Sequence, residues 1–404
     1  MRAVIDQDAV RSPAADAAAA AVDGDEIVAW GRGLIAARSE NPGGTEDEAA
    51  GVAAEILTGL DVSSEVVRGE GERPSLVATT GAGQGSSLAW NGHLDTVPAG
   101  SADTWSQPPF AGALVDGRLV GRGACDMKGA IAAALGAAAG LRRAGVALAG
   151  SLTFHLAADE ELAGVHGTQV LRDRGLLTQD AAVIGEPTGL TLALAERGGA
   201  WITATSFGQA AHGSQPHRGV NAITSMARFL LRLPEGLPDQ EHSLCGRASV
   251  NAALIEGGSA PNVVPDRCTV DIDRRIIPGE TDRDAVLAPF RALVDDLRSD
   301  HPEVDITVQI REWTDAAEAP ADSRVATLAR GALAAETGSP PPDTGFTGIT
   351  DARFYINDAQ IPAIIWGPGS LSVAHTADEW VGVDDLVTAA RAYARLFVAF
   401  CGAA

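Results

Sequence analysis

The segment Ser151–Leu162, SLTFHLAADEEL, contains the pattern from which the fold of this chain is inferred. It begins as a short apolar strand, and three consecutive acids, Asp159, Glu160 and Glu161, follow the strand directly. Similar strands run into polar residues in "SLAWNGHLDTVP" and "AAVIGEP", and helical segments lie between them. Near-continuous apolar strands that alternate with helices are typical of an α/β fold, in which the sheet is buried on both faces.

The composition indicates a globular chain, because 46% of its residues are hydrophobic and 21% are charged. A length of 404 residues suits about two domains. The 53 Asp and Glu against 30 Lys and Arg give a net charge of −23, which argues against a broad basic face for nucleic acid or an anionic membrane. The N-terminus lacks a signal-peptide pattern, and no run of about 18 strongly apolar residues occurs. We therefore expect a soluble, cytoplasmic protein with no nucleic-acid or membrane partner.

The order of predicted elements divides the chain into four segments. Residues 1–24 are rich in Ala and Asp, and we expect them to form a loose N-terminal arm. Residues 25–195 and 314–404 both have the α/β pattern. Residues 196–313 read as β-α-β-β-α-β, which is enough for a small α+β domain. The smaller domain is therefore expected to be inserted into the larger one.

Five loops beside the predicted strands and helices carry histidine or acidic residues. The candidates are His93, Asp95, Asp126, Glu160, Glu161, Glu186 and His375. Each alone has an ordinary explanation, such as a turn histidine for His93 or a helix N-cap for Asp126. Loops at one edge of an α/β sheet form its ligand sites, however, so the joint pattern predicts a site there. The four cysteines form no C-x-x-C pair, so His, Asp and Glu must hold any metal.

Several motifs, in this order, carry a resemblance to a known family: "NGHLDTVPAG", "DGRLVGRGACDMKG", "ADEE", "GEPT", "AAHGS", "GGSAPNVVPD", "DARF" and "AHTADEW". The chain resembles the dinuclear zinc aminoacylases and exopeptidases of peptidase family M20. This family includes acetylornithine deacetylase, succinyl-diaminopimelate desuccinylase and the bacterial glutamate carboxypeptidase. The resemblance covers roughly residues 25 to 400. It implies a zinc-exopeptidase-like catalytic domain with a mixed central sheet flanked by helices, and an inserted lid and dimerisation domain.

The resemblance also implies a set of metal ligands. One Zn²⁺ takes His93 and Glu186, a second takes Glu161 and His375, and Asp126 bridges both. These are nitrogen and oxygen donors, which suit zinc, and Co²⁺ or Mn²⁺ can substitute for it. A hydroxide bridging the two ions would be available at neutral pH, because metal coordination brings the pKa of water down to about 7.

Two further residues near the metals take roles from the same resemblance. Glu160 matches the general base, which accepts a proton from the bridging water and returns it to the leaving amine. Asp95 matches the carboxylate that orients His93, which agrees with the shared face of residues i and i+2 in a strand. The Asp126–Met127 peptide bond is cis in similar proteins. Asp159 receives no role.

The inserted domain contributes further expected residues. His212 matches a histidine that reaches the partner subunit's site and stabilises the oxyanion, so we expect a homodimer formed through this domain. Asn262 and Arg275 match groups that contact the substrate, and an Arg fork suits a substrate carboxylate. Arg274 is an alternative to Arg275, because strand neighbours face opposite ways.

One departure from the family pattern concerns substrate choice. Gly348 belongs to the expected substrate-binding residues, and the next residue, Ile349, stands where relatives have a threonine. Three hypotheses follow. We favour a metal-dependent amidohydrolase that removes an N-acyl group from an amino acid or a similar carboxylate-bearing amine. The alternatives are a dipeptidase or carboxypeptidase acting on short peptides, and a catalytically silent binding protein, which the intact ligand set disfavours.

Overall fold

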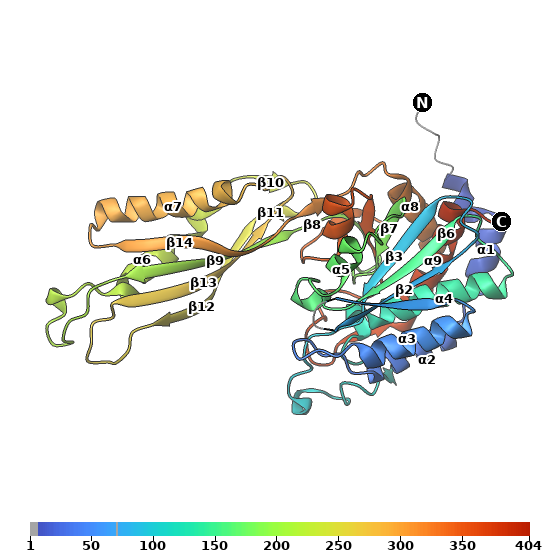
Figure 1. Cartoon of the computed structure of the whole chain (residues 1–404), viewed down its shortest axis with the longest axis horizontal. Coiled ribbons are helices and arrows are strands. Elements are labelled where there is room, and N and C mark those ends of the chain that lie inside the picture. Colours follow the sequence, from blue (N-terminus) through green and yellow to red (C-terminus); the bar gives the residue numbers. More distant parts are fainter. Residues whose placement is uncertain (1–6, 70–71) are drawn as a thin grey trace. The chain divides into compact units, whose positions relative to one another are not determined.

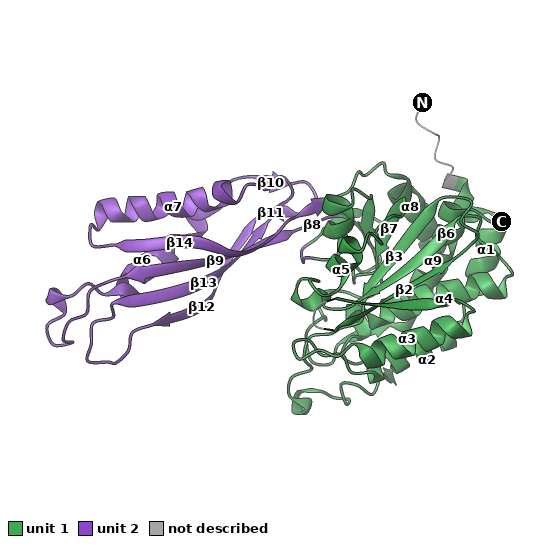
Figure 2. Ribbon diagram, viewed as in Figure 1, with its two compact units in different colours: residues 1–194, 318–346, 350–404 green, residues 195–317, 347–349 purple. Residues whose placement is uncertain are grey.

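The computed structural model describes residues 7–69 and 72–404 and divides the chain into two compact units (Figure 2). Unit 1 comprises Met1–Leu194, Glu318–Phe346 and Thr350–Ala404. Unit 2 comprises Ala195–Ala317 and Thr347–Ile349, whereas the sequence analysis expected an inserted domain over residues 196–313.

Unit 1 contains a nine-stranded mixed sheet. In spatial order its strands are β1 (Ser64–Arg68), β2 (Pro74–Thr80), β6 (Ser151–Ala157), β3 (Ser87–His93), β7 (Ala181–Ile184), β17 (Ala363–Ile365), β8 (Leu192–Glu196) and β15 (Ala317–Glu318), with β16 (Asp343–Phe346) paired to β8. The central strands β6, β3, β7 and β17 are parallel, and β1, β2 and β8 pair antiparallel with their neighbours. The predicted α/β fold with a mixed sheet flanked by helices is confirmed.

Both faces of the central strands β3, β6 and β7 are buried, as the apolar strands predict. On one face Trp90 packs edge-on against Tyr393 of α9 (Val383–Cys401), with ring centroids 5.9 Å apart. The adjacent Ala89 points to the opposite face, because side chains alternate along a strand, and belongs there to a cluster with Ile184 and Tyr355. The central strands therefore have no solvent-exposed face, and their loops are left to form a site.

Helices complete unit 1 (Figure 1). They are α1 (Pro13–Ala20), α2 (Gly24–Ala36), α3 (Asp47–Gly59), α4 (Gly129–Arg143), α5 (Thr168–Asp173), α8 (Arg324–Thr337) and α9. Within the described residues, one helical stretch, Ala124–Arg143, is long and apolar enough to cross a membrane, but 94% of its most apolar window is buried inside the protein. It is therefore the core helix of this unit. A small sheet of β18 (Trp380–Gly382), β5 (Arg118–Val120) and β4 (Ala113–Val115) lies beside it.

The prediction of a loose N-terminal arm is wrong for residues 7–24, and residues 1–6 lie outside the described part. Gln7–Arg11 form a 3₁₀ turn, and the Ser12 hydroxyl accepts the N–H of Ala15 to cap α1. Ala15 and Ala18 are fully buried, and α1 packs against α4 and α9. The alanines that resembled a disordered segment are the small residues that let α1 approach α4 closely.

Unit 2 is an α+β domain. Its elements follow one another as β9 (Gly198–Phe207), α6 (Ala222–Arg232), β12 (Ser249–Gly257), β13 (Arg267–Ile276), α7 (Arg283–Asp300) and β14 (Asp305–Thr314). The four strands form an antiparallel sheet in the order β12-β13-β9-β14, and β10 (Glu241–His242) and β11 (Gly246–Arg247) form a separate hairpin. Alternate residues of β13 are buried under α6 and α7, together with Phe229 and Phe290. Strand β12 lies at the edge of this sheet.

The close approach of α1 to α4 can be tested at Gly140. A Cβ added there would lie 2.7 Å from the Ala18 carbonyl oxygen. We expect Gly140→Ala to lower the free energy of unfolding by about 1–3 kcal/mol through overpacking, measured by urea denaturation. The matched control is Gly51→Ala in α3, where an added Cβ meets nothing within 4 Å and should stabilise by roughly 0.5–1 kcal/mol. Equal effects at the two positions would refute the contact.

Candidate metal centre

Three neighbouring parallel strands bring acidic and histidine residues to one edge of the unit 1 sheet. Strand β3 ends at His93, β6 is followed by Glu160 and Glu161, and β7 is followed by Glu186. Because β3 lies between β6 and β7 and pairs with both in parallel, their carboxyl ends meet at one edge. Asp126 precedes α4, and His375 comes from the loop between β17 and β18.

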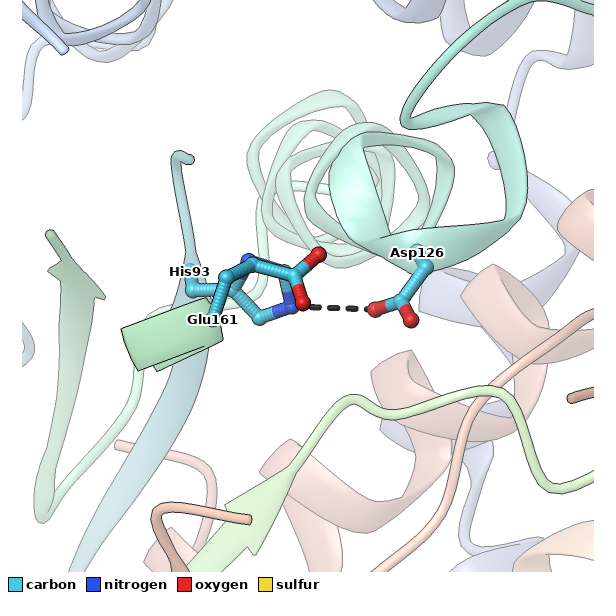
Figure 3. Close-up of side chains that lie close together, drawn as sticks. All are labelled: His93, Asp126 and Glu161. Atoms are coloured by element: carbon cyan, nitrogen blue, oxygen red, sulfur yellow. Dashed lines mark hydrogen bonds and ion pairs between the residues drawn. The ribbon is translucent and has the colours of Figure 1, made fainter. Parts of the chain in front are cut away.

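The Asp126 carboxylate lies between two histidines. Its Oδ1 is 3.0 Å from His93 Nε2, and its Oδ2 is 3.3 Å from His375 Nε2. Glu186 Oε1 lies 3.8 Å from His93 Nε2 on one side, and Glu161 Oε2 lies 3.1 Å from His375 Nε2 on the other. Figure 3 shows His93, Glu161 and Asp126 directed toward one another. The five expected ligands therefore lie as two pairs that share one carboxylate.

Donor atoms of these residues are close enough to hold metal ions. One set consists of His93, Asp126 and Glu161, and another of His93, Glu160 and Glu186; within each set the donor atoms lie within 4.8 Å of one another. The donors are imidazole nitrogens and carboxylate oxygens, which suit zinc and similar divalent ions. Burial and the repulsion of Asp126 raise the pKa of Glu186 well above its ordinary value. A buried group of like charges needs positive charge beside it, so the residues present fit divalent cations.

The two histidines have raised pKa values in the metal-free protein. Hydrogen bonds to Asp126 and Glu161 raise the pKa of His375 to about 10. Burial alone would lower the pKa of His93, but its bonds to Asp126 and Asp95 raise it well above its ordinary value. Both rings therefore carry a proton at neutral pH until a cation replaces it.

Glu160 differs from its neighbour Glu161 in its contacts. Among the described residues no hydrogen bond or ion pair involves the Glu160 carboxylate, whereas its backbone N–H donates to Asp95 and its backbone carbonyl accepts the N–H of Ala163. By contrast, Glu161 Oε1 accepts the N–H of Val97 at 3.2 Å, and its carboxylate pairs with His375. Burial is the main cause that raises the pKa of Glu160 well above its ordinary value. A free carboxylate of raised pKa is suited to proton transfer.

Asp95 is fully buried and organises the neighbouring backbone. Its oxygens accept the N–H groups of Glu160 at 3.1 Å and Glu161 at 3.2 Å. The His93 Nδ1 lies 3.0 Å from the Asp95 carbonyl oxygen and 3.5 Å from its carboxylate. The nearer partner of the imidazole is thus the backbone carbonyl, and the carboxylate mainly holds the turn that carries the two glutamates.

Several residues of the site were missed by sequence reasoning. Asp159 accepts hydrogen bonds from Arg73 and Asn41, and Glu46 accepts from Arg73. These polar residues lie in loops or at a helix end, and no periodic pattern marks them. Glu379, in the "AHTADEW" motif, accepts the N–H groups of Cys125 and Asp126 at 2.9 and 3.0 Å and pairs with Arg122.

The Asp126–Met127 peptide bond is cis, as the family resemblance implies. His155, inside β6, is fully buried, and its Nδ1 lies 2.7 Å from the Tyr355 hydroxyl oxygen. Burial lowers the pKa of His155 to about 4, so it is a neutral core residue.

The other expected site residues belong to unit 2. The His212 Nδ1 lies 2.8 Å from the Ser214 hydroxyl, and the Gly213 N–H donates to the Asn262 carbonyl at 2.7 Å, so His212 and Asn262 lie close together. Arg275 is partly exposed and donates to Asp273, whereas Arg274 is buried and paired with Glu280. The exposed guanidinium is therefore that of Arg275.

Gly348 and Ile349 also cluster with unit 2. The Ile349 side chain lies 3.1 Å from the position of a Cβ added at Gly199. Ile349 thus packs closely against the beginning of β9.

Comparisons with known proteins give a consistent family. The model of peptidase family M20/M25/M40 matches residues 89–399. The acetylornithine deacetylase of Myxococcus xanthus is 33% identical over 364 residues, covering 88% of this chain and 90% of that protein. A probable succinyl-diaminopimelate desuccinylase of Staphylococcus epidermidis is 27% identical over 376 residues, covering 86% and 91%. The chain belongs to peptidase family M20/M25/M40, and it is a hydrolase.

Solved structures show the same fold. Human carnosine dipeptidase 1 superposes with a TM-score of 0.77 at 19% identity, covering 96% of this chain and 98% of that one. The YXEP protein of Bacillus subtilis, described as a dinuclear metal binding peptidase, superposes with a TM-score of 0.69 at 18% identity, covering 93% and 97%.

Metal binding is expected to release protons, because His375 and His93 are protonated at neutral pH in the metal-free protein. Titration calorimetry of the metal-free protein with Zn²⁺ at pH 7, in buffers of different ionisation enthalpy, should show buffer-dependent heats, and the affinity should fall as the pH falls. His375→Ala should release fewer protons, and His301→Ala, at an exposed site, should release the wild-type number. Heats that do not depend on the buffer would contradict this assignment.

Proposed function

We propose that this member of peptidase family M20 is a two-zinc amidohydrolase that removes an N-acyl group from an amino acid or a related carboxylate-bearing amine. The observation that carries the proposal is the Asp126 carboxylate shared between His93 and His375, beside Glu160, whose carboxylate has no partner among the described residues. Relatives named as a deacetylase and a desuccinylase support an N-acyl amine as the substrate class.

The metal ligands follow from the two pairs in the site. His93 and Glu186 would hold one ion, Glu161 and His375 would hold the other, and Asp126 would contact both. Zinc is the proposed ion, and Co²⁺ or Mn²⁺ can replace it. When bound, such ions polarise an amide carbonyl and lower the pKa of water.

Glu160 carries the proton through the reaction. Its carboxylate accepts a proton from the attacking water while the carbon–oxygen bond forms. It then donates that proton to the amide nitrogen while the carbon–nitrogen bond breaks, which leaves a free amine and a carboxylic acid that keeps the second proton of the water. The raised pKa of Glu160 favours the protonated form between these two steps.

Residues of unit 2 are proposed to take part in catalysis and substrate binding. His212 stabilises the oxyanion in the site of the partner subunit. Asn262, Arg275 and Gly348 contact the substrate, with the Arg275 fork on its carboxylate. The burial of Arg274 and its ion pair with Glu280 favour Arg275 over its neighbour in this role. Ile349, in place of a threonine, shifts the substrate preference away from that of relatives.

We also propose a cytoplasmic homodimer formed through unit 2. The edge strand β12 exposes Leu254 and Ile255, 68% and 61% accessible, and an unpaired edge with large apolar side chains is suited to pairing with a second chain. All four cysteines are free and buried in the structure, which suits a reducing compartment.

The substrate class is tested by a hydrolysis screen of N-acetyl, N-succinyl and N-formyl amino acids and of dipeptides, with zinc or cobalt present. We expect turnover of an N-acyl amino acid. Glu160→Gln should keep both metals and lose about 10²- to 10⁴-fold in kcat, because the carboxylate that moves the proton is gone. Glu48→Gln, an exposed acid of α3, is the matched control. Turnover of dipeptides alone would favour the peptidase, and unchanged turnover in Glu160→Gln would place the base elsewhere.

The role of His212 is tested by complementation. His212→Ala and Glu160→Ala homodimers should each have low activity and bind metal normally. Mixed dimers should regain activity, because one of their two sites combines an intact Glu160 with the His212 of the other chain. A variant of the nearby His217, His217→Ala, is expected to be fully active as a homodimer. Absence of recovery in verified mixed dimers would refute action across the dimer.

A further inference from the structure

The largely buried guanidinium of Arg73 lies behind the turn that carries Glu160 and Glu161. Arg73, just before β2, donates from Nε to both carboxylate oxygens of Glu46, at 3.1 and 3.2 Å. Its Nη1 donates to Asp159 Oδ1 at 2.8 Å and to Asn41 Oδ1 at 2.9 Å. The Arg73 side chain is only 12% exposed. Two separate loops, residues 37–46 and the turn after β6, therefore meet on one cation.

The first consequence concerns the Asn41 amide. Because Arg73 donates to Asn41 Oδ1, the Nδ2 group of Asn41 is turned the other way. That Nδ2 donates to Asp95 Oδ2 at 2.9 Å and to Asp159 Oδ1 at 3.0 Å. Asp95 in turn accepts the N–H groups of Glu160 and Glu161. The orientation of one amide thus connects Arg73 to the backbone of both glutamates.

The second consequence concerns charge. The side chains of Glu46 and Asp159 are 0% and 3% exposed, and both pair with Arg73. Removing one partner of a buried ion pair leaves an uncompensated charge, which costs far more than the pair itself contributes. Without Arg73, the buried carboxylates of Glu46 and Asp159 would lose the ion pairs that compensate their charge.

The third consequence concerns the turn itself. Asp159 has a positive φ of 63°, a conformation that costs energy for a residue with a side chain. Its Oδ2 accepts the N–H of His166 at 2.9 Å, and its carbonyl accepts the N–H of Gly164 at 2.7 Å. Asp159 therefore closes the turn over Glu160 and Glu161, and Arg73 holds the carboxylate that closes it.

The space for the guanidinium is provided by a glycine. A Cβ added at Gly44 would lie 2.2 Å from Arg73 Nη2. Any larger residue at this position would push the guanidinium away from its acceptors while leaving its charge in the protein.

We propose that Arg73 is a positioning residue for the metal centre: by orienting Asn41 and neutralising Glu46 and Asp159, it sets Asp95 and the turn that presents Glu160 and Glu161. The proposal rests on the two-metal function proposed above. Among the described residues Arg73 contacts none of the proposed metal ligands, and no role in substrate binding is proposed for it.

The test is titration of the metal-free protein with Co²⁺, followed by the visible absorption of the bound ion, together with kcat and KM. Arg73→Met should weaken cobalt binding by about 10- to 100-fold and lower kcat with KM unchanged, because residues behind metal ligands have effects of this size. Arg73→Lys should recover part of the affinity, since it restores the charge but not the fork. Gly44→Ala should change both quantities in the same direction as Arg73→Met.

The matched control is Arg68→Met, which removes an arginine of β1 whose ion pair with Asp47 lies at the surface. It should bind cobalt as the wild type does. If thermal unfolding shows that Arg73→Met does not fold, the cobalt affinity and kcat of Gly44→Ala and Arg73→Lys test the proposal instead. Wild-type cobalt affinity in Arg73→Met or Gly44→Ala would overturn the proposal, as would an effect confined to KM. A wild-type protein that binds no cobalt would instead refute the two-metal function.

Discussion

The accumulation of buried negative charge at one edge of the sheet is the constraint on which the site depends. Asp126, Glu160, Glu161 and Glu186 gather there, with Asp95 behind them. Carboxylates that are taken out of water repel one another and lose hydration, so each must be held by hydrogen bonds or by cations. In the described part of the chain only two histidines face them directly. The arrangement is stable when divalent ions complete it, which is why metal binding and the geometry of the site are linked.

Much of the unit 1 fold serves to hold these carboxylates from behind. Glu379 accepts two backbone N–H groups of the loop that carries Asp126 and is itself neutralised by Arg122. Asp95 does the same for the turn after β6. In both cases a buried carboxylate accepts hydrogen bonds from backbone N–H groups of a loop. A cation or an amide group in turn bonds to that carboxylate. The proposed ligands are therefore positioned through their main chain, which leaves their side chains free to bind metal.

The sequence predicted the part of the site that follows from strand order. Parallel apolar strands end at one edge, so His93, Glu161 and Glu186 could be expected together. Asn41 and Arg73 could not, because an isolated polar residue in a loop carries no periodic signal, and its partners lie far away along the chain. The N-terminal arm was misjudged for a related reason. An alanine-rich segment has a composition typical of disorder, and the sequence does not show that its alanines pack against a groove of other small residues.

Glu160 and Glu161 show how neighbouring residues come to differ. Their backbone N–H groups donate to the two oxygens of the same carboxylate, that of Asp95, so the backbone N–H groups of both residues are held in the same way. The difference arises in their side chains: Glu161 is tied by Val97 and His375, and Glu160 is tied by nothing among the described residues. A carboxylate with fixed partners suits a ligand, whereas one with no partner can accept a proton and release it. The proposed division of roles thus rests on which side chain the surrounding loops engage, and neither composition nor spacing in "ADEE" encodes it.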